Sequence, residues 1–224
     1  MKLFKKWLDQ TLPGKKVIVI GAGSLGKLTV DCILKNNDYQ RNNIAIVDDN
    51  SKIEGHSILG IPVIGEIDKS QILNKNKDIE FVVAIANNKI RKKIVKQNLM
   101  LKYTKVLSKE AIISPFSKIG KGSIILPGVV VDPDASILDH VIVNKSATIA
   151  HDVTLKDFSQ VSPGVNFGGF VELGECSFVG LGAVVLPSVK ITEDVVIGAG
   201  AVVTKNIDIT SSTFVGNPAK ILKN

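Results

Sequence analysis

The sequence predicts a Rossmann-like α/β nucleotide-binding unit over residues 1–108, followed by a parallel β-helix over residues 109–224. Three observations predict this division. In the first half, strand segments alternate with amphipathic helical segments, and a glycine-rich turn joins the first strand to the first helix. The second half repeats one hydrophobic pattern every six residues. Alternating strands and helices indicate parallel strands covered by helices, and a short fixed period indicates stacked coils.

The composition is that of an ordinary folded chain. Of the 224 residues, 45% are hydrophobic and 22% are charged, so we expect a packed core and little disorder. A net charge of +7 suits anionic small molecules as well as nucleic acid. With only 5% aromatic residues, the chain has few stacking platforms for bases, so no nucleic-acid partner is expected.

Cysteine usage and hydropathy predict a cytoplasmic protein. Cys32 and Cys176 are far apart and have neither disulfide nor zinc-site spacing. No apolar run reaches the roughly 18 residues of a membrane span, and the N-terminus lacks a signal-peptide pattern. An apolar face around Trp7 lies beside basic residues, and we expect it to pack on the protein rather than on anionic lipid.

The first half contains three strand segments and two helical segments. Strands are expected at residues 16–20, 43–49 and 78–88, and helices at residues 25–34 and 87–100. A further short extended piece is expected near residues 61–67. The unit ends near residue 105, which makes it too short for a complete dinucleotide-binding fold of two halves.

The second half carries an unbroken six-residue repeat. Every sixth residue from Ile113 to Ile221 is apolar, and the residue four positions later is small or β-branched. A helix cannot keep a six-residue period on one face, whereas short strands joined by tight corners can. Three hexads then form one triangular coil of about 18 residues, so the repeat supplies roughly six coils. Stacked coils bury a continuous core that no single coil can form.

Five segments resemble the sialic acid O-acetyltransferase family, which includes the bacterial UDP-4-amino-sugar N-acetyltransferases. The resemblance covers nearly the whole chain from Lys16 onward. It implies left-handed winding, a homotrimer formed through the β-helices, and acetyl-CoA sites between neighbouring subunits, with no metal. The implied reaction is direct transfer of acetyl from acetyl-CoA to the amino group of a nucleotide-linked amino sugar in bacterial glycan biosynthesis. The segments are GAGSLGK (21–27), IVDD (46–49), IANNKIRKKI (85–94), VNKSATIAHDVTL (143–155) and FVGNPAK (214–220).

The family's catalytic histidine matches His151, and the acidic residue after it matches Asp152. Transfer from a thioester needs a base to accept a proton from the attacking amine, and imidazole, with an ordinary pKa of about 6.5, suits this role. A carboxylate bonded to the other ring nitrogen fixes the tautomer. Because adjacent strand residues point to opposite sides, we expect the pair to meet across a corner or between neighbouring chains.

Two other histidines and one cysteine are weaker candidates. His140, on the preceding coil, and His56, in a loop, are expected to be passive surface residues. The repeat also resembles that of hexapeptide-repeat carbonic anhydrases, but only two histidines lie within it, so their three-histidine zinc site is not expected. Cys176 has no histidine near it in sequence, so we expect no acyl-enzyme.

The glycine-rich turn at residues 21–26 lies between a strand and a helix, where backbone N–H groups can hold phosphate. Taken alone, this turn and an acidic residue about twenty positions later are typical of NAD binding. In the resembling family the same elements bind the nucleotide of the sugar substrate. Some relatives have glycine where this chain has Ala86, whose methyl group is expected to narrow the sugar pocket. The matching substrate-binding positions are Gly23, Ser24, Leu25, Asp48, Asp49 and Ala86.

The family's acetyl-CoA contacts match Gln160, Leu181 and Ala199. The amino-sugar enzymes can have histidine at the first position and glycine at the last. Gln160 still offers hydrogen bonds, and a backbone contact at Ala199 needs no particular side chain. Basic residues near the C-terminus either meet the CoA phosphates or form a solvated face; they are Lys205, Lys220 and Lys223.

Three other functions remain open at this point. The same base would serve O-acetylation of a sialic-acid-type sugar. An NAD-dependent oxidoreductase would need a catalytic residue in the first half, where no convincing candidate is found. A non-catalytic sugar-nucleotide-binding scaffold would not need His151. The sequence leaves open the sugar, its nucleotide and the choice between nitrogen and oxygen.

Overall fold

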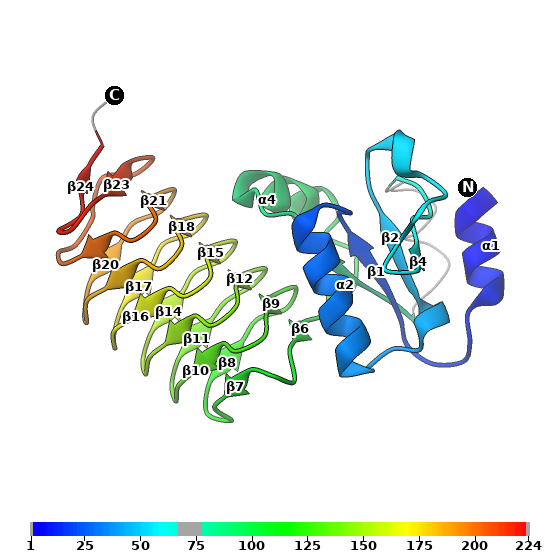
Figure 1. Cartoon of the computed structure of the whole chain (residues 1–224), viewed down its shortest axis with the longest axis horizontal. Helices are drawn as coiled ribbons and strands as arrows, with labels where there is room; N and C mark the ends of the chain where they lie inside the picture. Colours follow the sequence, from blue (N-terminus) through cyan, green and yellow to red (C-terminus); the bar gives the residue numbers. More distant parts are fainter. Residues whose placement is uncertain (1, 67–77, 223–224) are drawn as a thin grey trace. The chain divides into compact units, whose positions relative to one another are not determined.

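A computed structural model describes residues 2–66 and 78–222 of the chain. The chain divides into two compact units, Met1–Val106 and Leu107–Asn224. The first unit is an α/β structure and the second is a β-helix (Figure 1).

A three-stranded parallel sheet forms the centre of the first unit. Its order is β2-β1-β5, and the central strand pairs in parallel with both neighbours. The strand residues are almost all buried, as expected for strands covered on both faces. The predicted second and third strand segments are longer than the observed strands, because residues 48–49 and 84–87 form loops and Asn88 already belongs to the following helix. The strands are β1 (Lys16–Ile20), β2 (Ile44–Val47) and β5 (Ile79–Val83).

Two helices pack against this sheet, α2 on β1 and α4 on β5. Helix α2 (Ser24–Asn36) ends at Asn37, whose left-handed φ of 56° lets its N–H donate to two carbonyl groups of the last turn. Helix α4 (Asn88–Gln97) follows the end of β5. Between them lie η1 (Arg41–Asn43), η2 (Ser51–Ile53) and the hairpin of β3 (Ser57–Ile58) and β4 (Ile61–Pro62).

The N-terminal helix α1 (Lys2–Gln10) packs on the protein, as predicted. Trp7 is only 4% exposed, and its ring centroid lies 5.8 Å from that of Phe4. Within residues 2–66 and 78–222, no helix has the length and apolar character needed to cross a bilayer.

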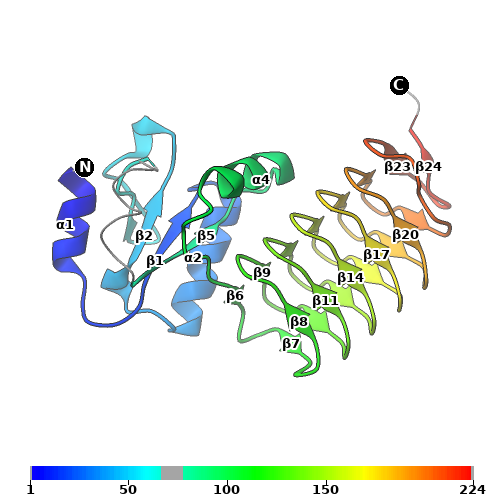
Figure 2. The same cartoon turned by 180° about the vertical axis from the view of Figure 1, so that it is seen from behind.

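The second unit stacks short strands into three sheets, which we call faces; all pairs are parallel except β23 with β24 at the C-terminal end. The first face contains β7, β10, β13, β16, β19 and β22; the second contains β8, β11, β14, β17 and β20; the third contains β6, β9, β12, β15, β18, β21, β23 and β24. Up to β22 the strands of each face are spaced 18 residues apart, as Val130 and Thr148 are, which confirms the predicted coil length. The last coil is shorter, since Val196 pairs with Thr213. Figure 2 shows these coils following one another from green to red.

Most strands contain two residues, and their bounds follow the hexad period. They are β6 (Val106–Leu107), β7 (Ile112–Ile113), β8 (Lys118–Ile119), β9 (Ile124–Ile125), β10 (Val130–Val131), β11 (Ser136–Ile137), β12 (Ile142–Val143), β13 (Thr148–Ile149), β14 (Thr154–Leu155), β15 (Gln160–Val161), β16 (Asn166–Phe167), β17 (Glu172–Leu173), β18 (Phe178–Val179), β19 (Val184–Val185), β20 (Lys190–Ile191), β21 (Val196–Ile197), β22 (Val202–Val203), β23 (Thr213–Val215) and β24 (Lys220–Ile221).

The core of the β-helix is made by the two predicted sets of hexad positions. Ile149 and Leu155, from the large apolar set, are fully buried, as are Ala147 and Val153 from the small or β-branched set. The corners between faces turn through residues with positive φ, such as Asp152 at 61°. These corners carry most of the candidate functional residues of this unit, and Gln160 lies in β15.

Candidate active site

His151 and Asp152 form the corner between the first and second faces, after β13 and before β14. Imidazole Nδ1 lies 2.9 Å from carboxylate Oδ2. The positive φ at Asp152 interrupts the alternation of a strand, so both side chains lie on the outer side of the same corner. The pair therefore meets within one chain, across a corner.

This hydrogen bond determines which ring nitrogen carries the proton. An ionised carboxylate only accepts, so Nδ1–H donates to Asp152 and Nε2 keeps its lone pair. The side chains of His151 and Asp152 are 56% and 41% exposed, so a ligand can approach them from solvent. In this arrangement Nε2 can accept a proton from a bound ligand.

Two residues of the next coil, Gly169 and Phe170, lie against the imidazole of His151. The Phe170 ring meets the His151 ring edge-on, with centroids 5.1 Å apart at 85°. A Cβ on Gly169 would lie 2.5 Å from the imidazole Cε1, so only glycine leaves room for this ring position. The sequence analysis did not identify Gly169, although its place 18 residues after His151 was an available signal.

The backbone N–H of Gly169 has no acceptor among the described residues. The equivalent corner positions of the coils before and after the His151 and Gly169 coils are Pro133 and Pro187, which have no N–H to satisfy. Gly169 therefore offers a hydrogen-bond donor beside the candidate base.

His140 does not belong to this site. It lies on a different corner, between the second and third faces, and it is only 1% exposed. Its ring stacks on that of Phe158, one coil further, with centroids 5.2 Å apart and planes 3° apart. The prediction of a surface histidine was wrong, because this aromatic ring from the following coil packs against it. His56 is exposed in a loop, as predicted.

Cys176 occupies the same corner as His140 and is also buried, at 8% exposure. Within the described ranges, no group of three or more His, Cys, Asp or Glu side chains is placed to hold a metal ion.

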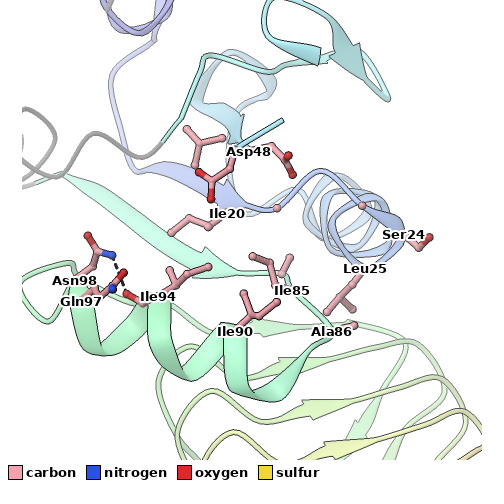
Figure 3. Close-up of a pocket in the computed structure, with 15 residues that line it drawn as sticks. Ile20, Ser24, Leu25, Asp48, Ile85, Ala86, Ile90, Ile94, Gln97 and Asn98 are labelled. Atoms are coloured by element: carbon pink, nitrogen blue, oxygen red, sulfur yellow. Dashed lines mark hydrogen bonds between the residues drawn. The ribbon is translucent and has the colours of Figure 1, made fainter. Parts of the chain in front are cut away.

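The six predicted substrate-binding residues line one pocket of about 660 Å³ in the first unit. Figure 3 shows Asp48 on one side of this pocket and the side chains of α4 on the other. The described lining residues are Ile20, Gly21, Gly23, Ser24, Leu25, Val47, Asp48, Asp49, Ala84, Ile85, Ala86, Ile90, Ile94, Gln97 and Asn98.

Two glycines give the loop of this pocket its shape. Gly21 has a φ of +110°, and a Cβ there would lie 2.8 Å from the carbonyl oxygen of Ala84. A Cβ on Gly26 would lie 2.0 Å from the carbonyl oxygen of Gly21. Both are therefore structural, whereas Gly23 is exposed and begins α2 as its N-cap.

The two helix N-termini near the pocket differ in their capping. No side chain caps α2, and its first turn contains no acidic residue. In α4, by contrast, the Oδ1 of Asn87 accepts from Ile90 N at 3.0 Å. Uncapped N–H groups and the helix dipole favour an anion, so the α2 terminus is the end of the pocket that suits a negatively charged ligand.

Asp48 has a structural role that the sequence analysis missed. Its Oδ2 accepts from Ala22 N at 2.7 Å, and its Oδ1 accepts from Asn50 N at 2.9 Å. The carboxylate thus ties the glycine-rich loop to the end of β2. Asp49, which is exposed, keeps its oxygens available for a ligand hydroxyl.

Helix α4 forms a wall of the pocket that was not predicted from the sequence. Ile90 and Ile94 are four residues apart on one helix face and continue the apolar surface of Ile85. Gln97 and Asn98 lie at the C-terminal end of the same wall (Figure 3). The sequence signal for this apolar helix face was the spacing of Ile90 and Ile94, which are four residues apart just after the helix N-cap.

The three predicted acetyl-CoA residues lie away from His151 within one chain. Leu181, 58% exposed, and Ala199, also exposed, lie 18 residues apart on the corner between the third and first faces. Gln160 belongs to β15 on the third face and is 8% exposed. Of the three basic C-terminal residues, Lys205 and Lys220 are exposed, and Lys223 lies outside the described residues.

The second unit is a β-helix of hexapeptide coils with a histidine–carboxylate pair at one corner, and it follows an α/β unit with a glycine-rich turn. This combination is that of a hexapeptide-repeat acyltransferase. Residues 16–98 match the PglD N-terminal domain family. A GDP-perosamine N-acetyltransferase of Escherichia coli O157:H7 is 30% identical over 182 residues, which cover 76% of this chain and 78% of that protein. The chain therefore belongs to the family of hexapeptide-repeat sugar N-acetyltransferases.

Solved structures agree with this assignment. The acetyltransferase domain of PglB from Neisseria gonorrhoeae FA1090 is 34% identical, with a TM-score of 0.85 over 93% of this chain and 100% of that one. A variant of the Caulobacter crescentus GDP-perosamine N-acetyltransferase, in complex with CoA and GDP-perosamine, is 28% identical, with a TM-score of 0.87 over 96% and 100%. The predicted left-handed β-helix is confirmed.

Membership of this family defines the enzyme class and the co-substrate. The protein is an acetyltransferase that uses acetyl-CoA and acts on an amino sugar. This decides against an NAD-dependent oxidoreductase, and it favours nitrogen over oxygen as the acceptor atom.

Proposed function

We propose that this protein acetylates the amino group of a nucleotide-linked amino sugar in bacterial glycan biosynthesis, with His151 as the general base. The α/β unit, residues 1–108, binds the nucleotide, and the β-helix, residues 109–224, carries the transfer. The observation that carries the proposal is the 2.9 Å hydrogen bond from His151 Nδ1 to Asp152, which leaves Nε2 as the accepting nitrogen. The reaction takes place in the cytoplasm, where acetyl-CoA is available.

The transfer is direct. The neutral amine attacks the thioester carbonyl carbon while Nε2 of His151 takes a proton from the nitrogen. The tetrahedral intermediate then expels the CoA thiolate, which receives that proton, so the products are an amide and CoA thiol. A positioned base typically contributes about 10²–10⁴ in rate.

The Gly169 N–H stabilises the oxyanion of that intermediate. Its lack of an acceptor among the described residues and its place beneath the imidazole support this role. A single oxyanion donor typically contributes about 10²–10³ in rate.

The nucleotide occupies the pocket of the first unit. Its diphosphate lies at the uncapped N-terminus of α2, where Gly23, Ser24 and Leu25 supply backbone N–H groups. Asp49, with the remaining lone pairs of Asp48, accepts from ribose hydroxyl groups. The apolar α4 wall accepts the face of the base, and the GDP-sugar bound to the Caulobacter relative makes GDP the first nucleotide to test.

Acetyl-CoA binds between two copies of this chain in a homotrimer. Leu181 and Ala199 lie on a different corner of the prism from His151, so one chain does not bring base and cofactor contacts together. A neighbouring copy that places its corner beside His151 completes the site, with Gln160 contributing a hydrogen bond.

The test is CoA thiol release from acetyl-CoA with GDP-perosamine, UDP-4-amino sugars or sialic acid as acceptor. We expect release with an amino sugar nucleotide, loss in His151→Ala, and no loss in the matched control His56→Ala, which removes an exposed loop histidine. Release only with sialic acid would contradict N-acetylation. Undiminished release by His151→Ala would contradict the base assignment.

A further inference from the structure

The pocket of the first unit has an unusual charge for a diphosphate site. Its described lining residues include Asp48 and Asp49 but no lysine or arginine. Backbone N–H groups at α2 supply partial positive charge, yet two carboxylates oppose an anionic ligand. A cation behind the lining would offset them.

Arg91 is such a cation. It lies on α4 and is only 1% exposed, which makes it one of the largest fully buried side chains of the protein. A guanidinium stays charged in proteins, and burying it is unfavourable unless its N–H groups are well bonded. Its Nη1 donates to the carbonyl oxygens of Ile85 at 2.8 Å and Ala86 at 3.4 Å, and its Nη2 donates to Asn88 Oδ1 at 2.9 Å.

The segment that Arg91 holds is itself a wall of the pocket. Ile85 and Ala86 both line it (Figure 3). This wall abuts the glycine-rich loop so closely that a Cβ on Gly21 would lie 2.9 Å from Ile85 Cγ1 and 2.8 Å from the Ala84 oxygen. Contacts therefore run without a gap from Arg91 through residues 84–86 to the loop that begins α2.

We propose that Arg91 is a positioning residue of the nucleotide site. Its planar guanidinium fixes the turn at Ile85 and Ala86, and this turn holds the glycine-rich loop in its binding shape. The positive charge of the guanidinium also stabilises a bound diphosphate from the other side of the pocket wall. The inference rests on the proposed nucleotide site, and it adds a residue that touches no ligand. A purely structural role would change stability without changing the nucleotide affinity of the folded protein.

The test compares Arg91→Met, which removes the charge at similar length, with Arg91→Lys, which keeps the charge and loses the fork. Lys93→Met, at an exposed position on the same helix, is the matched control. Binding of GDP, UDP and CoA is measured by calorimetry on the full-length protein, beside thermal unfolding and steady-state kinetics.

We expect Arg91→Met to weaken nucleoside diphosphate binding about tenfold or more, as loss of a supporting residue does elsewhere. The nucleoside diphosphate affinity of Arg91→Lys should lie between those of Arg91→Met and the wild type, and the affinity of Lys93→Met should equal that of the wild type. The KM for the sugar nucleotide rises, while kcat at saturation and CoA affinity stay within about twofold. If Arg91→Met does not fold, Arg91→Lys carries the test.

A folded Arg91 variant that binds nucleotide as tightly as the wild type would overturn the inference and leave the proposed function standing. A wild-type protein that binds neither GDP nor UDP would overturn the nucleotide assignment itself.

Discussion

The imidazole of His151 lies directly over the α-carbon of Gly169 on the next coil, where a Cβ would come within 2.5 Å of Cε1. The imidazole is therefore held from two sides, by the Asp152 carboxylate at Nδ1 and by Gly169 of the next coil.

Gly169→Ala should move the imidazole away from its position. We expect kcat to fall by about 10² or more, because small displacements of a catalytic group are costly, while CoA binding and the melting temperature change little. The control is Pro187→Ala, at the equivalent corner position one coil further. Full activity in Gly169→Ala would show that the ring has room that the structure does not indicate.

Asp152→Asn should reduce kcat by about 10² or more, because an amide no longer requires Nδ1 to carry the proton. Steady-state kinetics at saturating acetyl-CoA measure the effect. Asp134→Asn is the matched control, since Asp134 has the same left-handed backbone, φ 62°, at the same corner one coil earlier. An equal fall in kcat in both variants would mean that the aspartate stabilises the corner rather than orienting the imidazole.

Gly21→Ala and Gly23→Ala should separate loop shape from ligand approach. The first variant places a Cβ against the Ala84 oxygen at positive φ, and we expect a loss of about 1–3 kcal/mol in the stability of the first unit. A Cβ on Gly23 meets nothing within 4 Å, so that variant should keep its stability and lose only nucleotide affinity. Denaturant unfolding and calorimetry provide the two measurements, and equal stability of both variants would contradict the steric argument.

Mixed oligomers test whether the site is shared between copies. His151→Ala and Ala199→Trp should each be inactive alone, the first without its base and the second without room for CoA. After unfolding and refolding together, roughly a quarter of the interfaces would combine an intact His151 with an intact Ala199, so activity should return. No recovery, in mixtures that sediment as trimers and bind CoA, would place both groups in a single chain's site.

The acid stability of the first unit should depend on Glu80. Burial opposes its ionisation, but hydrogen bonds from Lys102 Nζ at 2.8 Å and Tyr39 Oη at 2.6 Å outweigh it, so its pKa lies below the ordinary 4.5. The unfolded state binds this proton more readily, so the stabilisation is present above about pH 4.5 and is lost as pH falls through the lowered folded pKa. Glu80→Gln should therefore flatten the dependence of the melting temperature on pH below 4.5, and an unchanged slope would assign acid sensitivity to other groups.

Much of this architecture follows from local patterns in the sequence. The six-residue period predicted the β-helix and its coil length, because the inward positions of a short strand recur regardless of distant contacts. The family resemblance grouped the glycine-rich turn, the acidic pair and Ala86 as predicted substrate-binding positions, and all six residues line one pocket. The hexad period in particular depends only on residues close together in the chain.

Other relationships arise only from the stacking of distant segments. His140 was expected on the surface and is buried, because Phe158 of the next coil stacks on it. Arg91 reads as one more basic residue of an exposed helix, yet its guanidinium lies beneath the pocket wall.

The sequence by itself thus determined the fold of both units and the identity of the His151–Asp152 pair. The tertiary structure decided the tautomer of the imidazole, the glycine beneath it, and the separation of His151 from Leu181 and Ala199 on different corners. The physical reason is that a hydrophobic period specifies which side chains face inward. The neighbours of the outward side chains are set by the turn geometry of each corner and by the residues of the coil stacked on it.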